Sequence, residues 1–252
     1  MSRSNFAERH PYSFAALMVL TAVAGYMLAG TAAALLKLPM LALYGGANLV
    51  LTLTAAGVLT LLGWWREAWF RPQRQPRDLL LFWLPLVPVL LNLAWGVRTT
   101  DLGHVAIYLA ISLMVGFVEE AFFRGLVLRA LLPRGMWRAV IVSSLLFGLM
   151  HSMNIASGSA PSAVLLQIGY ASAIGFCYAA LVLRTGTILP LVIIHFLTDF
   201  ANFVANDKIG RNGAATSLDA VITVAIIAAF TAYGAYLLRP ARRPATLAAA
   251  QP

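Results

Sequence analysis

Eight long apolar runs follow one another along the chain, separated by short segments that hold charged residues, prolines or glycines. Each run is close to the ~20 residues that an α-helix needs to cross a bilayer. The pattern predicts an all-α, polytopic membrane protein with about eight transmembrane helices and no internal repeat. The predicted spans are residues 13–36, 43–63, 79–97, 103–132, 137–155, 162–183, 188–204 and 218–238.

Two of these spans are predicted to depart from a straight crossing. The third contains Pro85 and Pro88, and proline removes a backbone donor and clashes with the preceding turn, so a kink is expected. The fourth, residues 103–132, is longer than a bilayer requires, so we expect it to tilt or to extend into the interface. Residues 1–12 are predicted to be a polar tail, residues 13–238 a single transmembrane domain, and residues 239–252 a basic disordered tail.

The amino-acid composition also indicates that the chain is embedded in a membrane. Hydrophobic residues make up 61% of it and charged residues only 11%, against about 25% charged residues in soluble domains. The net charge of +9 does not indicate nucleic-acid binding, because the basic residues lie between the apolar runs and not along one face. The single cysteine, Cys177, excludes an intrachain disulfide and a cysteine-rich metal site.

The basic residues predict an orientation. Thirteen of the 18 Lys and Arg residues fall in segments that share a side with the N-terminus, and four fall in the opposite segments. The positive-inside rule therefore places both termini in the cytoplasm. The Ala/Leu/Arg-rich composition suggests a bacterial inner (plasma) membrane.

Few ionisable side chains lie deep inside the apolar runs, where a charge is costly enough to mark a functional site by default. They are Glu119, Glu120, Arg124, His151, His195 and Asp199. Glu120 and Arg124 are four residues apart, so they share one face of a helix and are predicted to form an ion pair. Glu119 is rotated by about 100° from Glu120 and is predicted to be free for another task.

The remaining polar groups lie on two further spans. His195 and Asp199 are four residues apart on one span, and His151 lies on another. At 1.5 Å per helical residue, these groups and Glu119 lie about 15–22 Å from the inner ends of their spans. A shared cavity that contains water is therefore compatible with the spacing.

Two kinds of hydrolysis suit such a cavity. A buried glutamate can act as a general base on water while histidines orient the water or stabilise an oxyanion, which suits amide hydrolysis. A glutamate with two histidines also matches a zinc ligand set with one position open for water. The sequence therefore leaves a metal site formed by Glu119, His151, His195 and Asp199 as an alternative. The chain has no His-Glu-x-x-His and no Gly-x-Gly-Asp motif.

Three motifs carry these residues. They are Glu119-Glu120-x-x-x-Arg124, Phe147-x-x-x-His151 and His195-x-x-x-Asp199. Together, over about residues 116–200, they resemble the CAAX protease and bacteriocin-processing family, also called CPBP or Abi. The resemblance implies an eight-helix membrane fold with a family-like core over about residues 79–205 and a cavity open to the cytoplasmic side.

The resemblance also implies roles for the residues. Glu119 looks like the base that activates water, assisted by His151, while His195 and Asp199 look like the pair that stabilises the oxyanion. Glu120 and Arg124 look like a structural ion pair. The last motif position is often Asn in the family, so Asp199 adds a carboxylate that would favour either a metal or a proton shared with His195. Family members have been described both as metalloproteases and as metal-independent glutamic proteases, and we prefer the metal-free interpretation.

The predicted function is that of an intramembrane endopeptidase. Its substrate would be a membrane-anchored protein or a lipidated peptide, cleaved within the lipid bilayer, with zinc or another divalent metal only as the less favoured cofactor. Two alternatives remain at this stage: a non-catalytic immunity or scaffold protein of the same fold, and a transporter or proton-relay protein that uses the same buried groups.

Overall fold

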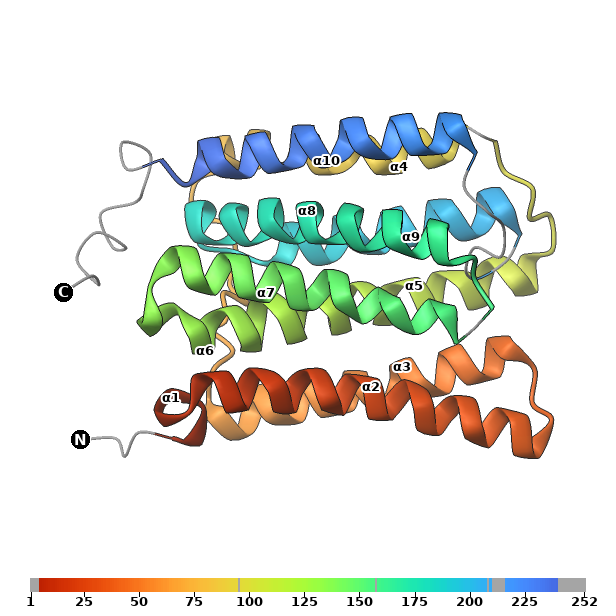
Figure 1. The fold of residues 1–252 in the computed structure, drawn as a ribbon, viewed down its shortest axis with the longest axis horizontal. Coiled ribbons are helices and arrows are strands. Elements are labelled where there is room, and N and C mark those ends of the chain that lie inside the picture. The colour runs from red at the N-terminus through yellow and green to blue at the C-terminus, as the bar shows by residue number, and fades with distance from the viewer. Residues whose placement is uncertain (1–4, 95, 157, 208, 210–215, 240–252) are drawn as a thin grey trace.

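A computed structural model describes residues 5–94, 96–156, 158–207, 209 and 216–239, and within them the chain is entirely α-helical, 3₁₀-helical, π-helical or irregular. The helices run side by side along one long axis (Figure 1). The α-helices are α1 Phe6–Arg9, α2 Pro11–Leu36, α3 Met40–Leu62, α4 Val87–Ala94, α5 Leu102–Glu120, α6 Arg129–Leu131, α7 Met136–Met150, α8 Pro161–Thr185, α9 Leu189–Asn206 and α10 Ser217–Leu237. Five shorter elements are the 3₁₀-helices η1 Pro76–Phe82, η2 Leu84–Leu86, η4 Leu132–Arg134 and η5 His151–Ile155 and the π-helix η3 Ala121–Leu128.

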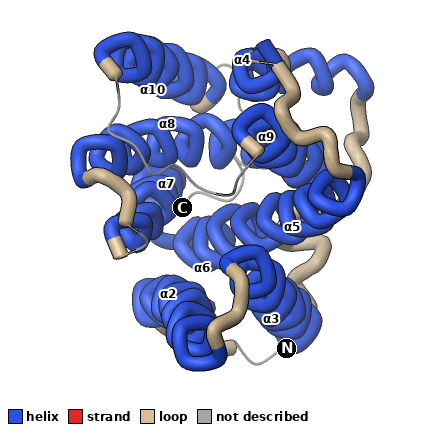
Figure 2. The backbone as a smooth tube through the Cα atoms, turned by 90° about the vertical axis from the view of Figure 1, so that its right-hand side faces the viewer, coloured by secondary structure: helices blue, strands red, loops and turns tan. Residues whose placement is uncertain are grey.

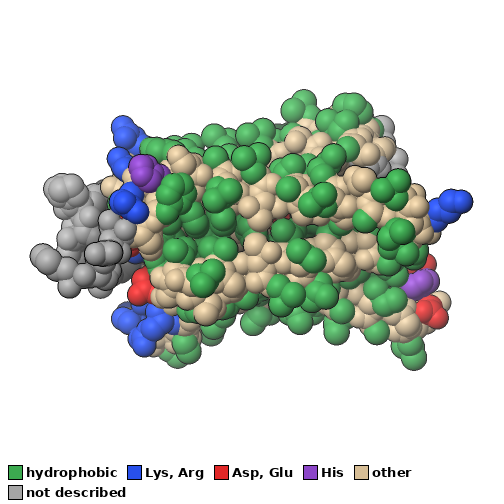
Figure 3. Space-filling model, turned by 90° about the horizontal axis from the view of Figure 1, so that it is seen from below, with side chains coloured by type: hydrophobic (Ala, Val, Ile, Leu, Met, Phe, Trp, Pro, Cys, Tyr) green, Lys and Arg blue, Asp and Glu red, His purple; other side chains and the backbone are tan. Residues whose placement is uncertain are grey.

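The predicted spans agree with this structure. Within the described residues, seven helices are long and apolar enough to cross a membrane, and the number rises to eight if a bent pair counts as one span. Large apolar side chains point outward along the bundle, such as those of Leu28, Leu61 and Leu102. Figure 3 shows an apolar flank with charged side chains gathered at its two ends. The chain is therefore a multi-pass membrane protein.

The predicted kink lies in the third span. The helical segments Pro76–Phe82 and Leu84–Ala94 meet at an angle of 50°. Pro85 and Pro88 lie just after the break, where each removes one backbone N–H donor. Beyond the bend, Asn92 of α4 donates a hydrogen bond to the carbonyl oxygen of Thr198 in α9, at 3.4 Å. The bent span is thus attached to the helix that carries two of the candidate site residues.

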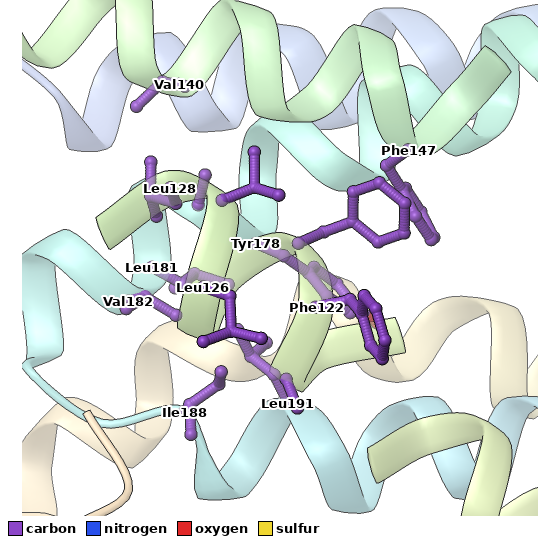
Figure 4. Packing of buried hydrophobic residues seen from close by; sticks show 14 of the residues in the cluster. Phe122, Leu126, Leu128, Val140, Phe147, Tyr178, Leu181, Val182, Ile188 and Leu191 are labelled. Atoms are coloured by element: carbon purple, nitrogen blue, oxygen red, sulfur yellow. The ribbon is translucent and has the colours of Figure 1, made fainter. Parts of the chain in front are cut away.

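The fourth span is a continuous helical stretch from Leu102 to Arg134. Its regular α-helix ends at Glu120, and the next eight residues form the π-helix η3, in which every residue is buried. Wide π-type turns are uncommon and frequently occur at functional sites. Figure 4 shows Phe122, Leu126 and Leu128 of this segment among the buried side chains of α7, α8 and α9. The candidate carboxylates therefore stand at the point where the helix changes its winding.

The polar segment before the first span is partly structured. Residues 1–4 lie outside the described part of the chain, but α1 follows directly, with Asn5 and Glu8 forming a reciprocal capping box. Ala7 is buried, and α2 begins at Pro11. Most of the predicted basic tail, residues 240–252, also lies outside the described residues. In Figure 1, α1 and the C-terminal end of α10 lie at the same end of the bundle.

A loop contact fixes the start of α9. The backbone N–H of Ile188 donates to the carbonyl oxygen of Trp69 at 3.0 Å, and the Thr187 hydroxyl donates to that of Arg71 at 2.6 Å. In return, Arg71 Nε donates to the carbonyl oxygen of Gly186 at 2.7 Å. The loop after α3 thereby holds the entry to α9.

Gly116 sets the distance between α5 and α9. A Cβ atom added there would lie 2.8 Å from the backbone nitrogen of Phe196 and 2.9 Å from the carbonyl oxygen of Val192. Contacts this short with backbone atoms cannot be relieved by a side-chain rotation. The close approach of the two helices therefore depends on the absence of a side chain at residue 116.

Gly116→Ala is expected to lower the thermal unfolding temperature of the purified protein, by an amount that corresponds to an overpacking cost of about 1–3 kcal/mol. The added methyl group should also push α9 away from α5. Gly57→Ala is the matched control, since nothing lies within 4 Å of a Cβ at that position of α3. Equal unfolding temperatures for the two variants would contradict this account of the α5–α9 contact.

Candidate active site

The candidate site lies where the end of α5 meets the middle of α9. Glu119 and Glu120 are the last two residues of α5, and His195 and Asp199 lie one turn apart on α9. Burial of apolar side chains orients both helices: Val118 and Gly116 face inward on α5, and Leu191 and Ile194 do so on α9. The polar groups between these apolar positions are thereby brought together inside the bundle.

The imidazole of His195 stands between three carboxyl groups. Its Nδ1 lies 2.9 Å from Glu120 Oε1, within hydrogen-bonding distance. Its Nε2 lies 3.3 Å from Glu119 Oε2 and 3.7 Å from Asp199 Oδ2. Glu119, His195 and Asp199 therefore lie close together, and Glu120 belongs to the same group.

Next to this group, Glu120 and Arg124 form a buried ion pair. Arg124 Nη1 is 3.1 Å from Glu120 Oε1, and the two side chains are 2% and 0% exposed. The guanidinium carbon of Arg124 also lies 4.2 Å from the centre of the Phe147 ring and 5.4 Å from that of Tyr178. These cation–π contacts help to keep the charge of Arg124 in a buried place.

Glu120 thus has a second contact that the sequence did not reveal. The spacing predicted its pairing with Arg124, but its hydrogen bond with His195 joins two spans that are 75 residues apart in the chain. Tyr178 also escaped the sequence analysis, because a tyrosine among apolar residues of α8 resembles ordinary core. Its ring lies edge-on to His195, with the ring centres 6.4 Å apart.

His151 lies at the end of α7, beside this group. Its Nδ1 is 3.0 Å from the carbonyl oxygen of Phe147. The ring of Phe147 stands edge-on to both histidines, with centre-to-centre distances of 5.2 Å to His151 and 6.2 Å to His195. Within the described residues, His151 forms no ion pair with a carboxylate, so Phe147 is its structural link to the other site residues.

The hydrogen bonds determine which ring nitrogens carry protons. A carbonyl oxygen only accepts, so His151 donates through Nδ1, and in the neutral ring Nε2 remains an acceptor. His195 donates through Nδ1 to the Glu120 carboxylate. Its Nε2 then either donates a hydrogen bond, in the imidazolium form, or accepts one from a protonated carboxyl group of Glu119 or Asp199, in the neutral form.

Charge neutrality favours a shared proton at this place. An imidazolium at His195 and the guanidinium of Arg124 supply two positive charges, whereas ionised Glu119, Glu120 and Asp199 supply three negative ones. A net charge buried at membrane depth is costly. One further proton, shared between the carboxyl groups of Glu119 and Asp199, makes the group neutral.

Exposure divides the site into two parts. The side chains of Glu119 and Asp199 are 22% and 23% exposed and that of His195 is 13% exposed, whereas Glu120 is fully buried. The exposed part can meet water and a substrate. The buried part, formed by Glu120 and Arg124, can only act on the histidine in front of it.

The described residues do not fit the metal site that the sequence left open. Among them, no group of three or more His, Cys, Asp and Glu side chains is arranged so that it could hold a metal ion. In addition, both ring nitrogens of His195 already face carboxylates. No step of the mechanism below therefore runs through a metal.

The sequence was compared with known proteins. Residues 101–201 match the family model described as Type II CAAX prenyl endopeptidase Rce1-like. No curated protein and no solved structure matches the chain. The matched segment begins just before α5 and ends within α9, so it contains all six polar residues that the sequence singled out inside the spans. Over residues 101–201, this membrane protein is therefore similar to the Rce1-like family of type II CAAX prenyl endopeptidases.

Proposed function

We propose that the chain is an intramembrane endopeptidase that hydrolyses a peptide bond of a prenylated or otherwise membrane-anchored substrate. The observation that carries this proposal is the convergence of Glu119, His195 and Asp199, all partly exposed, within a bundle of apolar helices. A base and a second carboxyl group that both face one hydrogen-bond donor are parts suited to amide hydrolysis. The match of residues 101–201 to the Rce1-like family model supports the same reaction class.

Glu119 is the proposed general base. Its carboxylate removes a proton from a water molecule, whose oxygen attacks the carbonyl carbon of the scissile bond. The same proton then passes to the nitrogen of the leaving amine, so that Glu119 returns to its starting state. Glu120 is unsuited to this task because it is fully buried and held by Arg124 and His195.

His195 is the proposed donor to the oxyanion. Its Nε2 faces the exposed part of the site, while Nδ1 is fixed by Glu120 at 2.9 Å. An anionic partner on Nδ1 stabilises the imidazolium form, which donates from Nε2 to the tetrahedral intermediate. Asp199 lies on the same face of α9, where its carboxyl group can hold the further proton of the site and leave Glu119 ionised.

His151 is proposed to orient the attacking water. Because its Nδ1 donates to the carbonyl oxygen of Phe147, its Nε2 can accept a hydrogen bond from a water molecule. Water that donates one proton to Glu119 and the other to His151 has its oxygen lone pair directed away from both, toward an incoming carbonyl carbon.

The proposed location is a bacterial inner membrane, with both ends of the described chain in the cytoplasm. The same-side arrangement of α1 and the end of α10 supports an even number of crossings (Figure 1), which requires that the bent pair counts as a span. The excess of basic residues in the segments on that side supports its cytoplasmic placement.

The test uses the purified full chain in liposomes and an internally quenched peptide that ends in a farnesylated Cys-aliphatic-aliphatic-X sequence. We expect release of the terminal tripeptide, identified by mass spectrometry, and incorporation of ¹⁸O from labelled water into the new carboxyl group. Prior treatment with EDTA or 1,10-phenanthroline should leave the rate unchanged, since the proposed mechanism uses no metal.

Two outcomes would contradict parts of this proposal. Absence of cleavage would overturn the assignment as a peptidase of prenylated substrates. Loss of activity on chelation, restored by zinc, would replace the metal-free mechanism while leaving the peptidase assignment intact. The same peptide without the farnesyl group serves as the control for substrate class.

A further inference from the structure

The helix that carries His151 changes its winding at this residue. α7 ends at Met150, and the 3₁₀-helix η5, His151–Ile155, follows directly. A 3₁₀-helix closes one turn in about 3 residues, so side chains three positions apart lie on the same side of it. Asn154 is therefore the residue of η5 that follows His151 on the same side, one turn further along the chain.

Asn154 attaches this turn to the neighbouring helix. Its side-chain Nδ2 donates a hydrogen bond to Gln167 Oε1 of α8, at 2.8 Å, in a half-buried place. The carbonyl oxygen of Asn154 also accepts from the backbone N–H of Ser159, at 3.0 Å. Because a buried amide that loses its partner is costly, the side chains of Asn154 and Gln167 hold each other in place.

A second contact fixes the chain just before His151. The backbone N–H of His151 donates to the carbonyl oxygens of Gly148 and Leu149 at the end of α7. Gly148 lies directly against α8, since a Cβ atom added there would be 2.7 Å from the carbonyl oxygen of Ile168 and would overlap the hydroxyl oxygen of Ser172. Figure 2 shows α7 and α8 next to each other.

His151 therefore lies between two points at which its chain is attached to α8. Gly148, three residues before it, lies against Ile168. Asn154, three residues after it, binds Gln167. Because Gln167 and Ile168 are adjacent in α8, both attachments lead to the same turn of that helix. The backbone that carries the imidazole is thus fixed from both sides.

We infer that Asn154, held by Gln167, is a positioning residue of the active site that acts through His151. Its hydrogen bond to α8 keeps the 3₁₀ turn in place, and with it the imidazole ring that is proposed to orient the attacking water. The inference rests on the proposed peptidase function. Since Asn154 acts on the orientation of a reactant, its loss should lower the rate of the chemical step and leave substrate binding unchanged.

Asn154→Leu removes the donor and keeps a side chain of similar size. We expect kcat for the farnesylated peptide to fall about tenfold with little change in KM, because a small misplacement of an orienting group is costly to the rate. Gln167→Met, which removes the acceptor, should have the same effect, whereas Gln167→Glu keeps an acceptor oxygen and should retain most of kcat. Asn206→Leu is the matched control and should retain wild-type constants, since the exposed amide of Asn206 donates to Asn202 within α9.

A double-mutant cycle with His151 tests whether Asn154 acts through it. In that case Asn154→Leu should lower kcat in the wild-type background and have no further effect in the His151→Ala background. A purely structural role predicts the same loss in both backgrounds. Thermal unfolding of each variant shows that the protein measured is folded, and Gln167→Met takes the place of Asn154→Leu in the cycle if the latter does not fold. Equal losses in both backgrounds, or wild-type kcat in the folded variant, would refute the inference.

The same assay separates this inference from the function on which it rests. If the wild type does not cleave the farnesylated peptide, the proposed function is wrong and the role of Asn154 falls with it. If the wild type and His151→Ala cleave at the same rate, the roles of His151 and Asn154 are wrong while the peptidase assignment stands.

Discussion

Glu119→Gln is expected to lower kcat/KM for the farnesylated peptide by about 10²–10⁴-fold, the usual contribution of a general base. Glutamine has nearly the shape of glutamate and can still bind water, but it cannot take the proton of that water. The side chain of Glu119 is 22% exposed, and its carboxyl oxygen Oε2 lies 3.3 Å from His195 Nε2. The folded structure should therefore survive the change, and the unfolding temperature should stay close to that of the wild type.

The matched control is Glu67→Gln, the same substitution at an exposed glutamate in the loop after α3. It should leave both activity and stability unchanged. Progress curves for the three proteins, measured with equal amounts of folded enzyme in liposomes, give the comparison. A Glu119→Gln variant within a few-fold of the wild type would show that another group activates the water.

Glu120→Leu is expected to have the largest effect on stability. It leaves the guanidinium of Arg124 buried, 2% exposed, without its anionic partner, and breaking a buried ion pair from one side typically costs about 3–5 kcal/mol. It also removes the acceptor of His195 Nδ1. Denaturant titration of the purified protein in detergent measures the first effect, and the peptidase assay measures the second.

The double variant Glu120→Leu with Arg124→Met separates these two effects. Removing both charges replaces the ion pair by apolar side chains, which is often neutral or even stabilising. We expect most of the stability to return while activity remains low, because His195 still lacks the carboxylate that fixes its ring. If activity returns together with stability, the pair has only a structural role and the contact with His195 is unimportant for the reaction.

The sequence predicted the membrane spans well because bilayer thickness imposes one length on every crossing. The run predicted at residues 162–183 corresponds to α8, Pro161–Thr185, and the run predicted at residues 13–36 corresponds to α2, Pro11–Leu36. The break near Pro85 and Pro88 followed from the chemistry of proline. Such features depend on local composition, and a single sequence contains that information.

Contacts between helices were harder to predict. The pairing of Glu120 with Arg124 depends on the winding of one helix, so its spacing was visible in the sequence. The contact of Glu120 with His195 depends on how α9 is rotated against α5, which the close approach at Gly116 determines. Nothing in the local pattern specifies that rotation.

The change of winding after Glu120 has a consequence for the evolution of the chain. A π-type turn holds more residues than an α-helical turn, so loss of one residue between Ala121 and Leu128 could be absorbed by a return to regular α-helix. A deletion before Arg124 would change its spacing from Glu120 and disturb the buried ion pair between them. Between the paired glutamates and the end of this helix, selection should therefore tolerate changes of side chain more readily than changes of length.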